Sequence, residues 1–302
     1  MPDRELSAIE ADLDPPFSVV APACQTSPFV FCSPHSGRVY PRHFLEQSRL
    51  DGLALRKSED CFVDQLFAHV VEVGAPLISA RFPRAYIDVN REPYEIDPEL
   101  FGSPLPDWAN TQSPRVIGGL GTIARIVADG EEIYPPRTRL PLDVALVRIE
   151  RLYKPFHAAL TALLDETRDR FGFAVLIDCH SMPSAGPGTS PASRPQFVLG
   201  DRFGTACDGA LTRFYRDAVT ALGYDVHLNR PYAGGYITEH YGRPLKGVHA
   251  LQLEINRGLY VDERRMTATA GYHSLQRNLE LLTRRALLQV PALLDQRAAA
   301  AE

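Results

Sequence analysis

The sequence predicts an α/β protein, a three-layer sandwich in which helices pack on a central sheet. Short apolar runs typical of buried strands occur at 29–32, 173–177 and 248–256. Segments with helical apolar spacing alternate with them, and 141–172 is the longest of these. Because the chain shows no internal repeat and no convincing boundary, we expect one domain over 28–302 after an irregular lead-in at 1–27.

The elements of the first half follow from local patterns. The run at 29–32 breaks into a Pro/Gly/Ser turn that carries His35. Residues 57–74 have the spacing of an amphipathic helix, with Ser58 as N-cap and Gly74 at the C-terminal stop. The next apolar stretch, 76–91, predicts two strands or one interrupted strand.

The second half adds a long loop and the remaining helices and strands. Residues 92–115 contain five prolines, and a loop of that length is often functional, so a lid is one hypothesis for it that the sequence does not decide. Pro155 should kink or divide the helix at 141–172. The later expected elements are a strand before Gly200, a helix around 205–221 closed by Gly223, a short strand near Val226, a glycine-rich loop at 231–236, the strand 248–256, and a final helix from about 263 to the mid-290s.

Composition excludes several classes of function. The net charge is −5 and no basic block occurs, which argues against nucleic acid as a partner. No segment has the roughly 18 uninterrupted apolar residues of a membrane span. The five cysteines are scattered without a C-x-x-C pair, so neither a thiolate zinc site nor a disulfide framework is indicated. We therefore expect a reduced, cytoplasmic protein, whose oligomeric state the sequence does not indicate.

Two histidines follow buried strands, at the edge where open α/β sheets build ligand sites. His35 and His180 are candidate ligands of a catalytic zinc ion, which keeps three protein ligands and one open position. Taken alone, a histidine at the end of a strand is more often a hydrogen-bonded loop residue. Asp178 points to the same side as His180 because strand side chains alternate, so it is a candidate to orient the imidazole.

The third ligand remains open at this point. Glu59, Asp60 and Asp64 cluster at the start of the helix predicted at 57–74. Acidic residues in a first helical turn also complement the helix dipole without any metal.

Charged residues on two other segments are candidates for binding and proton transfer. Arg91 can take a substrate carboxylate with two parallel hydrogen bonds, and Arg84 can face a developing oxyanion, unless both arginines only pair with Asp88. Glu254 emerges from an apolar strand and can carry the proton that a zinc hydrolase moves, although a plain edge strand would explain it equally well.

The stretch 230–244 contains Gly234, Gly235 and Arg243. The paired glycines allow close approach to a ligand, and they equally suit an ordinary hairpin.

Six segments in this order resemble the N-formylglutamate amidohydrolase family, and the likeness runs from about 28 to 285. They are "SPHSGRVYP", "SEDCFVD", "RAYIDVNR", "IDCHSMP", "AGGYITEHYGRP" and "LQLEINRGLYVDE". The family is similar to zinc carboxypeptidases and aspartoacylases. The resemblance implies a phosphorylase/hydrolase-like (zinc exopeptidase-like) fold with a mixed central sheet, one zinc ion, and hydrolysis of N-formyl-L-glutamate to formate and L-glutamate.

The resemblance also implies roles for individual residues. The zinc ligands are His35 and His180, the general base and acid is Glu254, the polarising arginine is Arg84, and the carboxylate is bound by Asn90 and Arg91, together with Arg257 or Arg243. In the carboxypeptidase pattern a zinc glutamate stands three residues after the first histidine, and here that position is Arg38. Because arginine cannot ligate zinc, we expect Asp60 to be the third ligand.

Two alternatives remain open. A deacylase of another N-acyl amino acid, or a carboxypeptidase-like enzyme acting on small peptides, would use the same residues. A carboxylate-binding protein without turnover would keep the scaffold and lose the metal. In either enzymatic case the partner is a small molecule.

Overall fold

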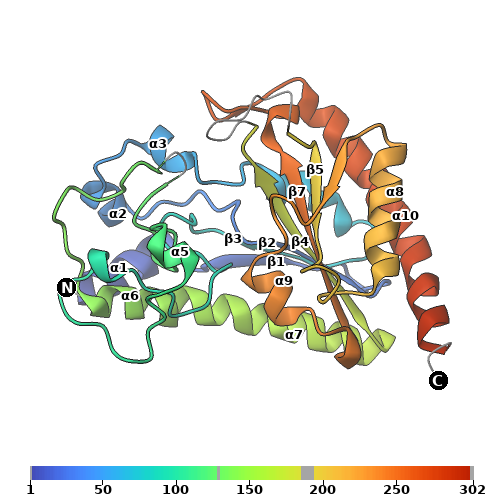
Figure 1. Cartoon of the computed structure of the whole chain (residues 1–302), viewed down its shortest axis with the longest axis horizontal. Coiled ribbons are helices and arrows are strands. Elements are labelled where there is room, and N and C mark those ends of the chain that lie inside the picture. The colour runs from blue at the N-terminus through green and yellow to red at the C-terminus, as the bar shows by residue number, and fades with distance from the viewer. Residues whose placement is uncertain (1, 128–129, 185–193, 300–302) are drawn as a thin grey trace. The chain divides into compact units, whose positions relative to one another are not determined.

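The structure, a computed structural model, describes residues 2–127, 130–184 and 194–299. Its sheet has the strand order β1-β3-β2-β4-β7-β5-β6 (Figure 1). The strands are β1 (Phe17–Val20), β2 (Phe29–Ser33), β3 (Leu77–Ala80), β4 (Ala174–Met182), β5 (Phe197–Gly200), β6 (Val226–Leu228) and β7 (Val248–Asn256). β2, β4 and β7 run parallel, whereas β5 pairs antiparallel with β7, which confirms the mixed α/β class.

The contacts within the chain group it into two compact units of three segments each. Unit 1 comprises Met1–Ser18, Pro34–Asp60 and Ser79–Ala159, and unit 2 comprises Val19–Ser33, Cys61–Ile78 and Leu160–Glu302. The single domain expected over 28–302 stays a prediction.

One face of the unit 2 sheet carries the main hydrophobic core. Alternate side chains of β4 and β7, such as Val175, Ile177 and Leu253, are fully buried there. They pack against helices α4 (Val63–Leu66), α8 (Gly209–Ala221) and α10 (Gly271–Ala299), and the last two lie side by side in Figure 1. Side chains at odd and even positions of a strand point to opposite faces, so the residues between them face the other way.

The opposite face of the same strands carries polar side chains toward the carboxyl ends of β4 and β7. Asp178 and His180 of β4 lie beside Gln252 and Glu254 of β7 in the parallel register. Helix α9 (Tyr236–Tyr241) packs on this face against both strands. The alternation of a core residue with a polar residue along β4 and β7 therefore places four polar side chains on the side that α9 covers.

Unit 1 is built from short helices and loops around one longer helical stretch. Helix α6 (Leu142–Arg148) continues through a π-helical turn (Ile149–Tyr153) into α7 (Lys154–Phe171), whose residues from Leu160 on belong to unit 2, and the N-terminal helix α1 (Pro2–Asp12) packs on α6 and α2. Further helices of its described residues are α2 (Arg42–Gln47), α3 (Gly52–Arg56), η2 (Pro98–Leu100) and α5 (Pro114–Ile117). Pro155 falls at the second residue of α7, and the stretch expected at 141–172 is not divided there but continues through the π-helical turn that precedes it.

Several predicted elements are wrong in extent. The helix expected at 57–74 is reduced to α4 and η1 (Ala68–Val70), because Phe62 has φ 63°, a left-handed backbone that no α-helix can continue through. Ser58 is therefore no N-cap, although Gly74 does have the expected positive φ of 93°.

The segment 84–91 is a loop rather than a strand. The amides of Tyr86 and Ile87 both donate to the Pro83 carbonyl, which forms a turn and removes them from any strand ladder.

The two ends of the chain also differ from expectation. Residues 1–27 are not irregular, because they contain α1 and β1. The final helix begins at Gly271 rather than 263, since β8 (Val261–Asp262) and β9 (Thr267–Ala268) form a hairpin first. Two further short helices are η6 (Pro244–Lys246) and η7 (Arg257–Leu259).

Other expectations are met or remain open. β7 has the predicted bounds, while β4 continues to Met182, so Asp178 and His180 lie inside the strand instead of after it. The sequence also predicts a loop from Gly188 to β5, and its first part, 188–193, lies outside the described residues. The lid role of 92–115, a segment that contains η2 and the start of α5, stays a prediction.

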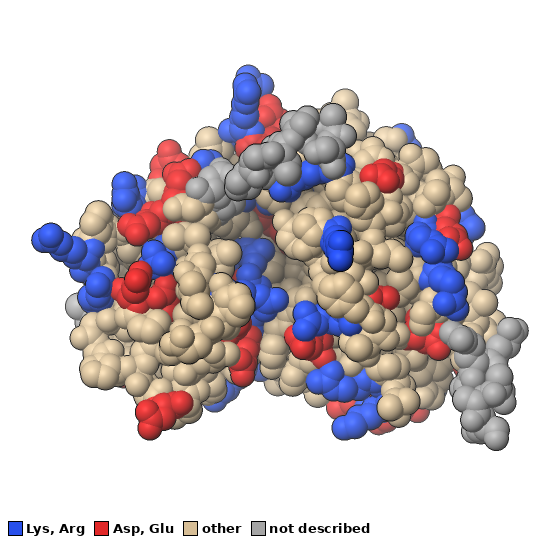
Figure 2. Space-filling view, in the orientation of Figure 1, with Lys and Arg blue, Asp and Glu red and all other residues tan. Residues whose placement is uncertain are grey.

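Two findings concern the surface and the helices. Across the described part of the chain, no helix combines the length and the apolarity needed to cross a membrane. On the face drawn in Figure 2, the acidic and basic side chains of the described residues are interspersed. The absence of a nucleic-acid partner stays a prediction.

Candidate functional site

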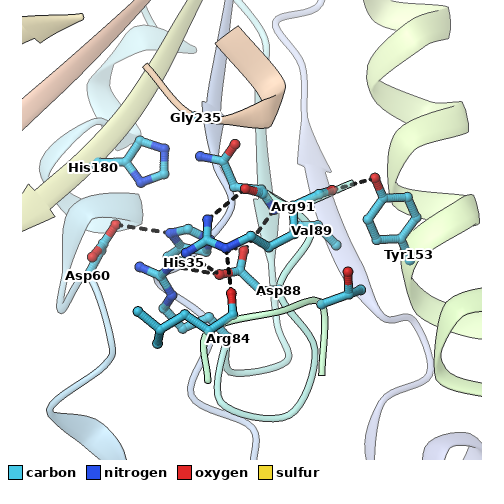
Figure 3. A network of polar contacts seen from close by, with 12 residues as sticks. His35, Asp60, Arg84, Asp88, Val89, Arg91, Tyr153, His180 and Gly235 are labelled. Atoms are coloured by element: carbon cyan, nitrogen blue, oxygen red, sulfur yellow. Dashed lines mark hydrogen bonds and ion pairs between the residues drawn. The ribbon is translucent and has the colours of Figure 1, made fainter. Parts of the chain in front are cut away.

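His35 lies two residues beyond β2, with 2% of its surface exposed. Its Nε2 lies 2.7 Å from Oδ1 of Asp88, and its Nδ1 lies 3.5 Å from Oδ2 of Asp60. The amide of Asp60 donates to the carbonyl of His35 at 3.0 Å, which holds the two backbones together. Asp88 thus fixes the imidazole with Nδ1 toward the Asp60 carboxylate (Figure 3).

Asp88 is a buried carboxylate with cationic neighbours. Arg84 Nη2 lies 2.7 Å from its Oδ2, and Arg91 Nη2 lies 3.5 Å from the same atom. Burial by itself would raise the pKa of Asp88, but Arg84, Arg91 and His35 together hold it well below its usual range. Asp88 therefore stays ionised at neutral pH. Arg84 and Arg91 do pair with Asp88, which is the structural alternative to a substrate-binding role for these arginines.

Arg91 is held mainly by backbone carbonyls. Its Nε donates to Leu120 at 2.8 Å and its Nη1 donates to Asn90 at 2.8 Å. The side chain is 10% exposed, and burial lowers its pKa to about 10 although Asp88 opposes this shift. The guanidinium is therefore charged at neutral pH and fixed in orientation before any ligand binds. Asn90 is also buried, in the same loop.

His180 has the same arrangement as His35 but within unit 2. Its Nε2 lies 2.8 Å from Oδ1 of Asp178, whose Oδ2 accepts a 3.0 Å hydrogen bond from the Thr238 hydroxyl of α9. All three side chains are buried. In both histidines a carboxylate takes Nε2, which leaves Nδ1 as the nitrogen suited to a metal.

Glu254 lies opposite His180 in the register of β4 and β7 and is 6% exposed. Gln252 Nε2 donates to Glu254 Oε1 at 2.9 Å, and Gln252 Oε1 accepts from the amide of Gly235 at 2.7 Å. A single amide side chain therefore connects the glycine-rich loop to the proposed proton carrier. The sequence alone had not indicated a function for Gln252.

Gly234 and Gly235 form the entry to α9. Gly234 has φ 115°, and a Cβ there would lie 3.1 Å from both Thr238 and Arg202 side-chain atoms, so glycine is required by conformation and space. Gly235 is the N-cap residue of α9, and its amide is the one that holds Gln252. The backbone at these glycines thus positions the Gly235 amide that holds Gln252. Direct contact of either glycine with the substrate stays a prediction.

The two later arginines differ in surroundings. Arg243 is exposed, and its Nη1 donates to the carbonyls of Glu239 and Gly242 at the end of α9, so it caps this helix. Arg257 is buried just after β7, with Nε 3.8 Å from Glu263 Oε1. A substrate contact by either remains a prediction, and Arg243 has a structural role that sequence reasoning missed.

Among the described residues, one group of side chains can hold a metal ion. His35, Asp60 and His180 are all buried, and each offers a ligand atom within 4.8 Å of the others. Two imidazoles and one carboxylate are a ligand set of catalytic zinc sites, and the carboxylates of Asp88 and Asp178 orient the two rings as zinc histidines require. The residues present therefore fit a zinc ion.

The same geometry separates the three acidic candidates. Glu59 accepts hydrogen bonds from the Tyr40 hydroxyl at 2.7 Å and from Arg56 Nε at 3.1 Å, so it belongs to another network. Asp64 lies within α4. Of the three, Asp60 is the one grouped with the histidines.

Comparison with known proteins gives a consistent result. The N-formylglutamate amidohydrolase family matches residues 27–261. N-formylglutamate deformylase of Pseudomonas putida is 30% identical over 241 residues, which cover 78% of this chain and 82% of the relative. The deformylase of Pseudomonas aeruginosa is 28% identical over 239 residues, with 78% and 83% covered.

Solved structures agree with the fold. The crystal structure of N-formylglutamate amidohydrolase from Ralstonia eutropha JMP134 has a TM-score of 0.84 and 36% identity, and the match covers 93% of this chain and 99% of that one. A gene product of Agrobacterium tumefaciens, with 18% identity and a TM-score of 0.65 over 91% of this chain and 94% of that one, shares the fold.

Proposed function

Because the chain belongs to the N-formylglutamate amidohydrolase family, we propose that it hydrolyses N-formyl-L-glutamate to formate and L-glutamate. One structural observation carries the proposal: the His35, Asp60 and His180 group, with Glu254 opposite His180 in the sheet register. A metal-assisted amide hydrolase needs a set of metal ligands and a nearby glutamate that can carry a proton, and this group offers both. We assign the reaction to a small-molecule substrate, and a cytoplasmic location stays a prediction.

The metal in this proposal is one zinc ion, held by His35, Asp60 and His180. When bound, zinc supplies a Lewis acid for the formyl carbonyl and lowers the pKa of a bound water toward about 7. Asp88 and Asp178 keep the two imidazoles oriented for this task.

Glu254 moves the proton. It takes a proton from the attacking water and passes it to the nitrogen of the departing glutamate. Gln252 supports this step, because its hydrogen bond to Oε1 fixes the plane of the carboxylate before the substrate arrives. Gln252 is itself held by the Gly235 amide, so the orientation of Glu254 depends on the loop ahead of α9.

The arginines bind negative charge. Arg84 has 24% of its side chain exposed, and we assign it to the oxygen that becomes negative when the formyl carbon is attacked. Arg91 and Asn90 bind one substrate carboxylate, and Arg257 is assigned to the second. Preorganised donors of this kind contribute because they need no reorientation when charge develops.

The test is formate release from N-formyl-L-glutamate by purified, zinc-loaded protein, with and without a chelator. Formate that disappears with the chelator and returns with added zinc supports both the reaction and the metal. No formate, from folded protein shown to hold zinc, would contradict the assigned substrate. N-acetyl-L-glutamate and glutamate dipeptides, offered in parallel, would then reveal a deacylase or peptidase of the same residues.

A further inference from the structure

The loop 84–91 carries Arg84, Asn90 and Arg91, yet none of its residues belongs to a strand or helix. Its backbone is instead held from one side by a single helical stretch, α6 to α7. Three side chains of that stretch donate to three carbonyls of the loop: Arg148 Nη1 to Tyr86 at 3.0 Å, His157 Nε2 to Val89 at 2.8 Å, and the Tyr153 hydroxyl to Arg91 at 2.8 Å. The last of these bonds is drawn in Figure 3.

The spacing of the three donors depends on the π-helical turn. Arg148 and Tyr153 are five residues apart, and in an uninterrupted α-helix such side chains point about 140° away from each other. The turn Ile149–Tyr153, closed by a bond from the Lys154 amide to the Ile149 carbonyl, contains one additional residue. It brings Tyr153 to the side of Arg148, and His157 follows four residues later on the same side.

Arg148 is anchored by a residue far away in the sequence. Its guanidinium is 0% exposed, lies 3.9 Å from the Tyr86 ring centroid, and donates through Nε to Glu5 Oε1 at 2.5 Å. A buried charge of this kind needs a partner. Glu5 lies in α1, outside the residues 27–261 that match the family, so the anchor includes a part of the chain that the family comparison does not cover.

Tyr153 is the donor with the most direct effect on the proposed carboxylate site. It binds the carbonyl of Arg91, while the Arg91 guanidinium bonds to the neighbouring Asn90 carbonyl and to Leu120. The direction of the guanidinium therefore follows the local backbone, and the Tyr153 hydroxyl is one of the groups that fix this backbone.

We propose that Tyr153, with Arg148 and His157, is a positioning residue that holds the loop 84–91 in the geometry in which Asn90 and Arg91 bind the substrate carboxylate. The π-helical turn aligns these donors. This inference rests on the proposed function for its kinetic consequence, and its structural consequence is measurable without any substrate.

The experiment compares Tyr153→Phe with a matched control, Tyr215→Phe. Tyr215 is equally buried but belongs to the hydrophobic core of unit 2. Tyr153→Phe removes one hydrogen bond and keeps the ring, so we expect KM for N-formyl-L-glutamate to rise about fivefold while kcat changes less than about twofold. Zinc content should equal that of the wild type, and backbone amides of 84–91 should exchange with deuterium about fivefold faster. Tyr215→Phe should change neither KM nor exchange in that loop.

The following outcomes would contradict the positioning role of Tyr153 or test it separately from the proposed function. Wild-type KM and wild-type exchange in Tyr153→Phe would overturn the positioning role, as would an equal rise of KM in Tyr215→Phe. If the wild type releases no formate, the proposed function fails, and the exchange experiment still judges the loop: acceleration confined to 84–91 supports positioning, and unchanged exchange overturns it.

Discussion

Replacing Glu5 with glutamine should destabilise the protein strongly, although Glu5 lies near the N-terminus and outside the group of proposed zinc ligands. Its carboxylate is 0% exposed. Oε1 accepts from Arg148 Nε at 2.5 Å and from the Tyr86 hydroxyl, and Oε2 lies 2.5 Å from His43 Nε2. Three buried side chains, from two other helices and one loop, thus contact the carboxylate of Glu5 in α1.

The magnitude follows from what the substitution leaves behind. Glutamine keeps the shape of Glu5 but not its charge, so the fully buried Arg148 loses its counter-ion. Removing one partner of a buried pair costs about 3–5 kcal/mol of the free energy of unfolding. The matched control is Glu46→Gln in α2, whose side chain is 49% exposed and pairs with Arg4 and Arg42. An exposed pair of this kind contributes about 0–1 kcal/mol.

The assay is urea unfolding of both variants, with the change read from the midpoint at constant m-value. The pH dependence gives a second criterion. Burial by itself would raise the pKa of Glu5, but Arg148 together with hydrogen bonds from Tyr86 and His43 lowers it below the usual 4.5. A lowered folded-state pKa contributes stability that is fully present above pH 4.5 and is lost as pH falls through the folded value. The difference between wild type and Glu5→Gln should therefore shrink in acid. A loss below about 1 kcal/mol at pH 7, equal to that of Glu46→Gln, would refute the reasoning.

Three further predictions concern the proposed chemistry. Glu254→Gln should keep zinc, measured by metal analysis, and lose about 10²–10⁴-fold in kcat; an unchanged kcat would exclude Glu254 as the proton carrier. Asp60→Asn should lower the zinc bound per chain after dialysis against a weak chelator, whereas Glu59→Gln should not, and the reverse ranking would reassign the third ligand. Arg91→Lys should raise KM for N-formyl-L-glutamate about tenfold or more, since lysine cannot reproduce the paired donors; a wild-type KM would remove Arg91 from the carboxylate site.

Strand alternation made part of the site predictable. The apolar runs of β4 and β7 located both strands, and the period of two placed Asp178 with His180 and Gln252 with Glu254 on shared faces. The contact of Asp88 with His35 was not predictable in the same way. It depends on the path of the loop 84–91, which the apolar pattern had assigned to a strand.

The sequence of the N-terminal helix contains a helical spacing of buried residues, but the acidic composition of this segment made it look irregular. Glu5, Ile9 and Leu13 are spaced four residues apart, and all three are buried. The pattern is helical, but its first member is an acid, which normally lies on a solvated face. Only the position of Arg148, 143 residues later, explains why a carboxylate occupies a core position.

The third ligand shows how a wrong helix boundary alters the interpretation of a residue. With a helix assumed from Ser58, Asp60 stood in a first turn, where the helix dipole explains an acid without any metal. The helix α4 begins only at Val63, after the left-handed Phe62, so Asp60 lies outside it, and the dipole argument applies to Asp64 instead. Asp60 is a buried carboxylate whose amide bonds to the His35 carbonyl, and burial of an ionisable group requires compensation. Asp60 is grouped with His35 and His180 in a set that could hold a metal ion, and this grouping is the reason for proposing it as the third zinc ligand.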